Sequence, residues 1–292
     1  MAVLNHPYGG LSGGRWLRGN LHAHTTRSDG AREPQAVVDD YAARGYDFLM
    51  LSDHDVYTSE LMLAELAARG MVLIPGNEVT AGGPHMLHVY ADRRVEPVAQ
   101  RQRVLMEAGH GRGFVVACHP NWEKHFEHCP LDWLMQWDGY AGLEIYNGLI
   151  GRHPGSPYAS DKWDQLLSAG RRLWGFANDD SHAAQGDTGL GWNMVYSAER
   201  TAKGIADALA AGRFYASTGV VITDIQVDRQ RICIRTENAQ RIVAHKRFGQ
   251  RLAVVDAGAM EVEVPEDAAY VRFECWGAGE QFAWTQPFFV VQ

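Results

Sequence analysis

The chain has few cysteines, only four among 292 residues, and they are scattered. They are Cys118, Cys129, Cys233 and Cys275, whose spacing is not typical of a disulfide framework or of a cysteine-rich zinc site. We interpret them as buried or free thiols, which is the state expected in a reducing compartment.

Long apolar runs and basic blocks are also missing. No segment approaches the roughly 18 consecutive apolar residues of a membrane-spanning helix. The first residues, MAVLNHP, lack the basic start and apolar run of a signal peptide. The formal net charge of −8, with no basic block, argues against a general nucleic-acid binder. We therefore expect a cytoplasmic protein without membrane or general nucleic-acid partners, for which a homo-oligomer stays open.

Apolar runs alternate with helical patterns through most of the chain. Strand-like runs occur at residues 45–52, 71–74, 86–90, 114–118, 142–146, 173–177 and 194–196. Helical patterns occur at residues 34–43, 59–69, 98–109, 162–169 and 201–211. This alternation predicts an α/β fold with a parallel sheet and outer helices. The number of strands, about seven or eight, favours closure into a barrel over an open sheet.

The pattern changes after Gly219. Short alternating runs without helical periodicity follow at residues 222–227, 231–236, 240–244, 260–264, 269–275 and 288–291. Turn residues separate them at 256–258 and 277–279. We therefore predict two domains, an α/β barrel at 1–219 and a small antiparallel β domain at 220–292. The second domain lacks clustered ligand types, so we interpret it as a packing or oligomerisation module.

Histidines and carboxylates follow most of the predicted strands of the first domain. His22 and His24 share one side of a strand, because residues i and i+2 point to the same face. Further polar residues at strand ends are Asp29, Asp53, His54, Asp55, Glu78, His85, His88, His119, Asp180 and His182. One such residue alone is often a loop or capping residue, but in a barrel the carboxyl ends of the strands build the active site. The recurrence predicts a metal cluster, and its nitrogen and oxygen donors suit Zn²⁺, Mn²⁺ or Fe²⁺.

The ordered set of motifs resembles the polymerase and histidinol phosphatase (PHP) superfamily. The motifs are His22-Ala23-His24 with Ser28-Asp29-Gly30, Ser52-Asp53-His54-Asp55, Glu78, His119-Pro120 and Asp180-Ser181-His182. The resemblance covers roughly residues 18–215. It implies a distorted (β/α)₇ barrel with two or three divalent ions at its mouth.

The resemblance also implies which residues hold the ions. The first ion is assigned to His22, His24, Glu78 and Asp180, and the second to Glu78, His88 and His119, with Glu78 as the bridge. Asp29, His54 and His182 are assigned to a third ion. His88 is preferred to His85 because Leu-His-Val fits the apolar–His–apolar pattern of the family.

A narrower resemblance points to the carbaryl-hydrolase-like branch, which cleaves aryl N-methylcarbamates and carries a C-terminal β segment. It is carried by the motifs at 143–148, 178–182, 191–195 and 212–219. The resemblance implies a metal-dependent hydrolase that uses metal-bound hydroxide. A phosphoesterase for mono- and diesters, extending to triesters, is the first expectation. The alternative is an aryl ester or N-methylcarbamate hydrolase on the same centre. A non-catalytic metal-binding module is disfavoured because every motif is filled.

The remaining predictions concern proton transfer and the substrate. A side chain must assist the leaving group, and the candidates are His54, His182 and Asp55. Substrate-binding candidates come from the loops after two strands, and they are Trp122, Asn147, Arg152 and His153. Arg152 is either a phosphate ligand or a solvated loop residue. Trp122 lines either an aromatic pocket or the core.

Overall fold

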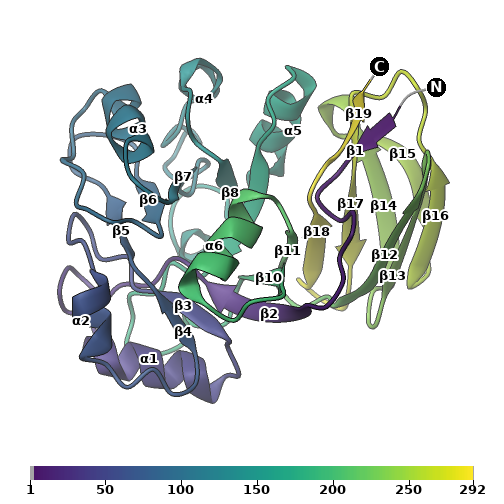
Figure 1. The fold of residues 1–292 in the computed structure, drawn as a ribbon. Coiled ribbons are helices and arrows are strands. Elements are labelled where there is room, and N and C mark those ends of the chain that lie inside the picture. Colours follow the sequence, from purple (N-terminus) through teal and green to yellow (C-terminus); the bar gives the residue numbers. More distant parts are fainter. Residues whose placement is uncertain (1–2, 292) are drawn as a thin grey trace.

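The computed structural model describes residues 3–291, which form a mixed α/β part beside a group of antiparallel strands (Figure 1). The helices are α1 (Pro34–Ala43), α2 (Glu60–Ala64), α3 (Arg101–Gly109), α4 (Leu131–Gln136), α5 (Ser160–Ser168) and α6 (Ala202–Ala210). Two short 3₁₀ turns are η1 (Leu149–Arg152) and η2 (Arg247–Gly249). The helix α1 begins with Pro34, whose fixed φ suits a first helical turn.

One sheet of the α/β part has five strands. In spatial order they are β5 (Gly76–Val79), β6 (Met86–Val89), β7 (Phe114–Ala117), β8 (Gly142–Asn147) and β9 (Trp174–Asn178). The strands β7, β8 and β9 are parallel, whereas β6 is antiparallel to both β5 and β7. The connection at 80–85 is too short for the crossover that parallel strands require. The sequence-based prediction of a parallel sheet is therefore wrong at β6. It is also wrong at residues 194–196, which lie in β10 (Trp192–Ser197) and pair antiparallel with β2 (Arg15–Asn20).

A second sheet has eleven strands and runs through both parts of the molecule. Its path is β1 (Val3–Asn5), β19 (Phe288–Val291), β17 (Tyr270–Trp276), β18 (Phe282–Thr285), β11 (Phe214–Ser217), β10 (Trp192–Ser197), β2 (Arg15–Asn20), β3 (Phe48–Met50) and β4 (Val72–Ile74). The strands β14 (Arg241–Lys246) and β15 (Gln250–Val255) branch from β17. A third sheet contains β12 (Ile222–Asp228), β13 (Arg231–Thr236) and β16 (Ala259–Glu263).

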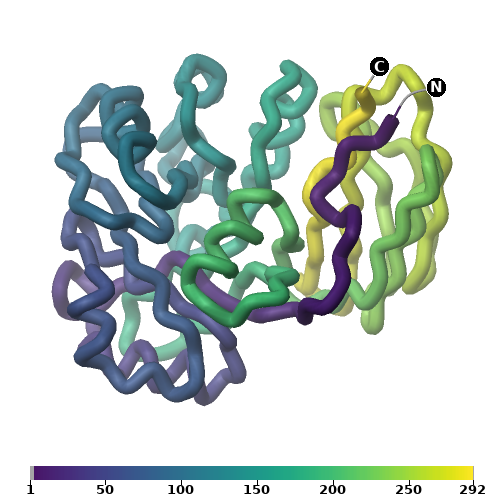
Figure 2. The backbone as a smooth tube through the Cα atoms, in the orientation of Figure 1, coloured from purple at the N-terminus to yellow at the C-terminus, as the bar shows by residue number. Residues whose placement is uncertain are grey.

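The predicted boundary after Gly219 divides the chain in sequence, but strand pairing crosses it. Tyr215–Ser217 of β11 pair with Ala283–Thr285 of β18. The strand β1 pairs with β19, and Figure 2 shows the N-terminal segment beside the C-terminal one. The N-terminal strand therefore belongs with the antiparallel part. The outer bounds of the two predicted domains, residues 1 and 292, lie outside the described residues.

The first two sheets meet at the end where the polar residues gather. Isolated bridges join Ala23 to Ser181 and His54 to Glu78 across the gaps between the sheets. Apolar side chains fill the space between them, among them Leu21, Phe48, Leu87, Val116 and Phe176. The continuous seven-stranded barrel stays a prediction, because the ladders of the described residues are interrupted at these gaps.

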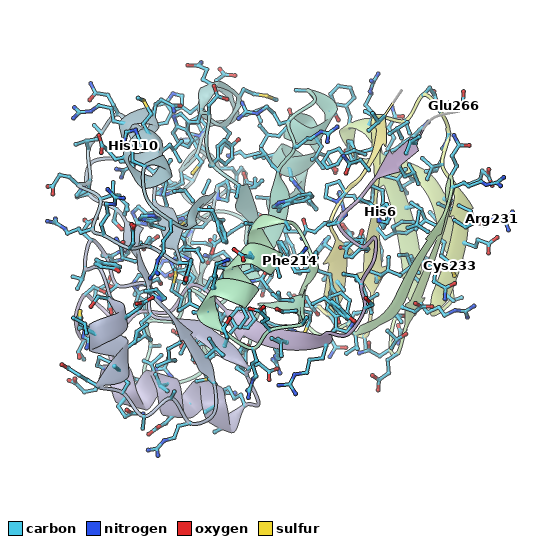
Figure 3. The ribbon with its side chains drawn as sticks, viewed as in Figure 1. His6, His110, Phe214, Arg231, Cys233 and Glu266 are labelled. Carbon is cyan, nitrogen blue, oxygen red and sulfur yellow. The ribbon has the colours of Figure 1, made fainter. Side chains whose placement is uncertain are left out.

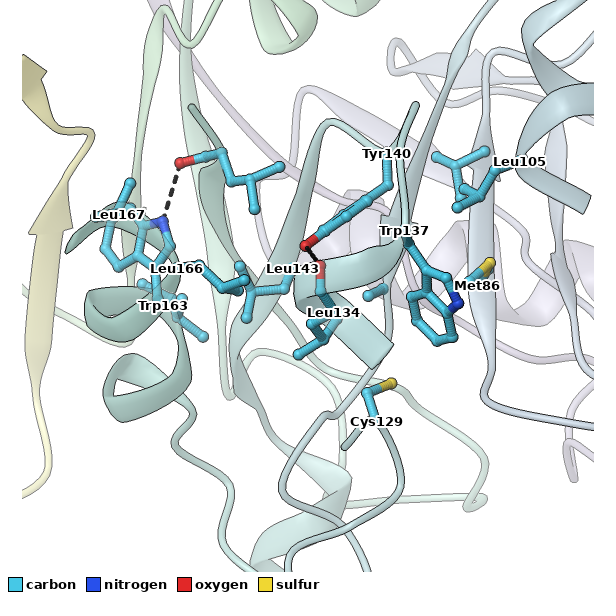
Figure 4. Packing of buried hydrophobic residues seen from close by; sticks show 14 of the residues in the cluster. Met86, Leu105, Cys129, Leu134, Trp137, Tyr140, Leu143, Trp163, Leu166 and Leu167 are labelled. Atoms are coloured by element: carbon cyan, nitrogen blue, oxygen red, sulfur yellow. Dashed lines mark hydrogen bonds between the residues drawn. The ribbon is translucent and has the colours of Figure 1, made fainter. Parts of the chain in front are cut away.

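A second apolar cluster packs α3, α4 and α5 against the five-stranded sheet. Figure 4 shows Trp137, Leu143 and Trp163 in this cluster. The indole of Trp163 donates to the carbonyl of Leu173 at 2.9 Å, and the Tyr140 hydroxyl donates to the carbonyl of Leu134 at 2.6 Å. Because this apolar cluster holds the outer helices against the sheet, it also fixes the strand ends from which the loops after β6, β7 and β8 leave.

All four cysteines carry free thiols, as the sequence predicts. Cys118 and Cys129 are buried in the α/β part, whereas Cys233 lies on β13 of the antiparallel part (Figure 3).

Within residues 3–291, no helix combines the length and the apolar character that crossing a membrane requires.

Candidate metal centre

Glu78 of β5 lies at the middle of a buried cluster of histidines. Its Oε1 is 3.3 Å from His22 Nε2, 3.0 Å from His85 Nδ1 and 3.4 Å from His119 Nε2. Its Oε2 is 2.6 Å from His54 Nδ1 and 3.5 Å from His24 Nε2. The two carboxylate oxygens thus face different histidines, which is the arrangement that a bridging carboxylate needs.

Asp180 completes the deepest group of donors. It follows β9, and its Oδ1 lies 3.1 Å from His22 Nε2 and 3.2 Å from His24 Nε2. His22 and His24 lie just beyond the end of β2, on either side of Ala23, which forms an isolated bridge with Ser181, and both imidazoles reach Asp180. The structure therefore brings His22, His24 and Asp180 together.

A third group lies nearer the surface. Asp29 Oδ2 is 3.5 Å from His54 Nε2, and Asp29 Oδ1 is 3.3 Å from His182 Nε2. The Asp29 side chain is 57% exposed, whereas that of Glu78 is fully buried. This group is therefore open to solvent in a way that the Glu78 and Asp180 groups are not.

The donor atoms fit a divalent ion. Within the described residues, His22 Nε2, His24 Nε2, Glu78 Oε2 and Asp180 Oδ1 are buried without a hydrogen-bond partner of good geometry. Buried polar atoms nearly always have such a partner. Their convergence, with nitrogen and oxygen donors only, suits a metal such as zinc or manganese.

The pKa shifts of the buried groups are also consistent with a site for a divalent ion. Burial disfavours the charged form of His22, but the carboxylates of Asp180, Glu144 and Glu78 outweigh it and raise its pKa well above the usual value. Burial also favours a neutral Glu78, yet the nearby His22 and His85 hold the pKa of Glu78 well below its usual value. The cluster thus carries ionised buried carboxylates that require positive charge beside them.

Glu144 of β8 is a site residue for which the sequence reasoning proposed no role. Its Oε1 accepts from His22 Nδ1 at 2.8 Å and from Asn178 Nδ2 at 2.9 Å. Its Oε2 accepts from the backbone N–H of His119 and from Asn147 Nδ2, both at 2.8 Å. With Nδ1 held this way, Nε2 of His22 is the atom left for a metal. The signal in the sequence was a carboxylate inside the apolar run Leu143–Ile145.

The structure does not bring His88 to the cluster, and His85 takes its place. In the β5–β6 pair, Glu78 lies opposite Leu87, and His88 lies opposite Asn77. Because side chains alternate along a strand, His88 points to the face away from Glu78. His85 precedes β6 and reaches Glu78 at 3.0 Å. The preference for His88 over His85 is corrected accordingly.

Asp55 is placed as a turn residue and not as an acid–base group. Its carboxylate accepts from the backbone N–H of Thr80 at 2.7 Å and from that of Ala81 at 3.0 Å. Both oxygens are therefore used to hold the connection that follows β5. Of the three acid–base candidates, only His54 and His182 face the cavity described next.

A cavity of about 320 Å³ opens onto the cluster. The polar residues at its floor and sides are Asp29, His54, His85, His119, Asp180 and His182. Its remaining wall consists of Trp122, Leu149, Ile150 and His153. Two of the four substrate-binding candidates, Trp122 and His153, therefore line this space.

The other two substrate-binding candidates have different positions. Arg152 is exposed and donates to the carbonyl of Gly186. Asn147 is buried and donates to Glu144 at 2.8 Å and to Asp180 Oδ2 at 3.2 Å. Asn147 thus supports a candidate metal ligand and does not line the cavity.

Comparisons with known proteins give local and structural likenesses. No protein-family model matches the chain. A segment of 73 residues, 24% of this chain, is 42% identical to the 3′,5′-nucleoside bisphosphate phosphatase of Chromobacterium violaceum. A segment of 97 residues, 30% of this chain, is 33% identical to the 5′-3′ exoribonuclease of Haemophilus influenzae. The matched segments span only 25% and 35% of these curated relatives.

The structural likeness covers almost the whole chain. A two-domain protein of Bacteroides vulgatus, containing a predicted PHP-like metal-dependent phosphoesterase, superposes with a TM-score of 0.58. The match covers 98% of this chain and 90% of that one at 18% identity. The two proteins therefore share an overall fold.

Proposed function

We propose that this chain is a PHP-type metal-dependent hydrolase that cleaves phosphomono- and phosphodiesters. The observation that carries the proposal is Glu78, whose two oxygens face separate histidines beneath a cavity. The two curated relatives, a phosphatase and an exoribonuclease by name, support phosphate esters as the substrate class. The PHP-like protein of Bacteroides vulgatus supports the fold on which this chemistry rests.

The ligand groups suggest two buried ion sites and one exposed site. His22, His24 and Asp180 with Glu78 make the first, and Glu78 with His85 and His119 makes the second. Asp29, His54 and His182 make the third. Divalent ions such as Zn²⁺, Mn²⁺ or Fe²⁺ would polarise the ester and lower the pKa of a water molecule, so no serine or cysteine nucleophile is needed.

His54 and His182 are the proposed proton donors to the leaving group. Both line the cavity, and Nδ1 of His182 is 2.9 Å from the backbone carbonyl of Asp180. That contact directs Nε2 of His182 towards Asp29 and the cavity. With ions in the two buried sites alone, these imidazoles would be free to protonate the leaving group, and with an ion in the third site they would hold that ion instead.

The wall of the cavity favours an aromatic or apolar leaving group. Trp122, Leu149 and Ile150 give the cavity an apolar side, on which the Trp122 ring packs against His85 and His119, and no lysine or arginine is among the described residues that line it. The same observation supports a second candidate, the hydrolysis of aryl esters or N-methylcarbamates at the same centre. The two functions differ in the group that is attacked and not in the residues that hold the ions.

The proposal is tested by metal content and substrate profile together. The protein is loaded with Mn²⁺ or Zn²⁺, and bound ions are counted by mass spectrometry. It is then assayed on p-nitrophenyl phosphate, bis-p-nitrophenyl phosphate, a nucleoside 3′,5′-bisphosphate and 1-naphthyl N-methylcarbamate. Hydrolysis of the phosphate esters supports the first function, whereas hydrolysis of the carbamate alone supports the second.

A Glu78→Gln variant provides the decisive comparison. It removes the bridging charge with little change in volume, so we expect loss of bound metal and of activity. Glu65→Gln, which alters an exposed glutamate, is the matched control and should behave as the wild type. A wild-type protein that binds no divalent ion, or a fully active Glu78→Gln variant, would overturn the proposal.

A further inference from the structure

The two histidines of the proposed second ion site lie on two separate loops. His85 ends the connection 80–85 between β5 and β6, and His119 begins the loop 119–130 between β7 and α4. His22, His24 and Asp180 of the proposed first site also lie beyond strand ends, after β2 and β9, and of the proposed ligands in the buried sites only Glu78 lies on a strand. The second ion site therefore depends on whatever fixes these two loops.

A buried arginine holds the first loop. Arg101, the first residue of α3, is 1% exposed. Its Nε donates to the carbonyl of Pro84 at 2.6 Å, and its Nη2 donates to the carbonyl of Thr80 at 2.6 Å. A third bond joins Nη1 to the carbonyl of Val98 at 2.9 Å. Both ends of the connection are thereby tied to one guanidinium, and Pro84 directly precedes the ligand His85.

A buried lysine holds the second loop in the same manner. Lys162 of α5 is 7% exposed. Its ammonium donates to the carbonyls of Pro120 at 2.8 Å, Phe126 at 2.6 Å and Cys129 at 2.8 Å. These carbonyls lie at the start, middle and end of the loop 119–130. Pro120 directly follows the ligand His119.

The two loops are also joined to each other. The backbone N–H of His85 donates to Nε2 of His128 at 3.0 Å, and the backbone N–H of Cys118 donates to the carbonyl of His85 at 3.1 Å. His85 and His119 are therefore set by one connected unit. Arg101 anchors one side of this unit and Lys162 anchors the other.

These contacts differ from ordinary packing because each places a positively charged group in the protein interior. Burying a cation is expensive unless its donors are satisfied, and here the acceptors of all the bonds are uncharged carbonyls. A lysine offers three donors from one nitrogen and an arginine five, so no neutral side chain could replace the bonds that meet at either point. Burial lowers the pKa of both groups, in agreement with their removal from water.

We infer that Arg101 and Lys162 are positioning residues for the second ion site, and that each fixes one of its histidines through the backbone of its loop. The inference rests on the proposed metal centre. The inference treats the two buried sites separately, because among the described residues no hydrogen bond or ion pair joins His22, His24 or Asp180 to either cation. Loss of either cation should thus weaken the second site and leave the first intact.

The test measures Mn²⁺ binding to the full chain. Titration calorimetry gives the affinity of each ion, and electron paramagnetic resonance distinguishes a coupled ion pair from an isolated ion. In Arg101→Met and Lys162→Met we expect one ion at wild-type affinity and the second bound about 10- to 100-fold more weakly. The coupled signal should give way to that of isolated Mn²⁺ at the same loading.

Arg171→Met is the matched control. The Arg171 guanidinium likewise donates to backbone carbonyls, at Met135 and Trp137, but these lie at the end of α4 and not beside a ligand histidine. This variant should keep the coupled signal. Arg101→Lys and Lys162→Arg, which retain the charge, should recover part of the affinity for the second ion. If the methionine variants do not fold, these two conservative variants decide the question.

The outcomes separate this inference from the proposed function. A wild-type protein that binds no ions, or only one, contradicts the proposed two-ion centre itself. A wild-type protein with a coupled ion pair, and folded variants that bind both ions as tightly, overturns the positioning role alone. An equal loss of both ions in the variants, or the same loss in Arg171→Met, also overturns it.

Discussion

Glu144 accepts a hydrogen bond of 2.8 Å from Nδ1 of His22, and its other oxygen accepts one of the same length from the backbone N–H of His119. One buried carboxylate on β8 thus orients proposed ligands of both proposed buried ion sites. It is also close enough to raise the pKa of His22.

Glu144→Gln should weaken metal binding without removing a ligand. The amide keeps the size of the side chain but loses the charge, so His22 becomes less basic and less firmly oriented. We expect an affinity about 10- to 100-fold lower, with activity recovered at high metal concentration. Metal titration followed by activity checks this, with the exposed Glu107→Gln as control. An unchanged affinity for the metal would mean that Glu144 contributes to packing and not to metal binding.

His85 and His88 should respond differently to the same substitution. His85→Gln removes a donor 3.0 Å from Glu78, and we expect loss of the second ion and of most activity. His88→Gln alters a side chain on the opposite face of β6, so both ions and the activity should remain. Bound metal per chain is the measurement. If His88→Gln instead lost the second ion while His85→Gln kept it, the sequence-based choice of His88 would be correct.

The buried His88 should make stability depend on pH. Burial lowers its pKa from 6.5 to about 4, so between these values the unfolded chain binds a proton that the folded chain does not. Stability is therefore fully present above pH 6.5 and falls as the pH decreases towards 4. Between pH 7 and pH 5 the loss from this group is about 2 kcal/mol.

The measurement for this effect is the difference between wild type and His88→Leu in urea unfolding at the two pH values. The variant lacks the titrating group, so its stability relative to the wild type should rise by about 2 kcal/mol on going from pH 7 to pH 5. Other histidines contribute equally to both proteins and cancel. A difference that does not change with pH would contradict the prediction.

The antiparallel part is tied to α5 by a buried ion pair. Arg272 of β17 donates to Asp164 through Nε at 2.7 Å and through Nη2 at 2.6 Å, and the Tyr270 hydroxyl adds a bond of 2.8 Å. Asp164→Ala leaves the arginine buried without its partner, which should cost about 3–5 kcal/mol of stability.

The double change Asp164→Leu with Arg272→Met removes both charges and should recover much of this loss, because well-packed apolar residues often replace a buried pair without penalty. Chemical denaturation of the single variant, the double variant and the wild type gives the comparison. A single variant as stable as the wild type would show that the pair does not hold the two parts together.

Much of the secondary structure was accessible from local pattern. The helices α1, α5 and α6 follow from apolar periodicity and boundary residues, and β12 and β13 follow from alternation. The strand β5 was missed because Gly76–Val79 has only four residues and contains two polar ones. The antiparallel pairing of β6 was not predicted. The alternation of strands and helices along the sequence does not show whether two strands joined by a short connection run parallel or antiparallel.

The sequence by itself determined which residue types stand at the strand ends, and hence the metal-binding character of the site. Periodicity is local, so the common direction of His22 and His24 needed no tertiary information. The tertiary structure decided that His85 rather than His88 faces Glu78, because the register of β6 sets the side on which each residue points. It also decided that Asp55 holds a turn and that Glu144 lies beside the ligands. Those roles depend on which distant backbone groups each carboxylate meets, and only the packing of the strands brings these groups together.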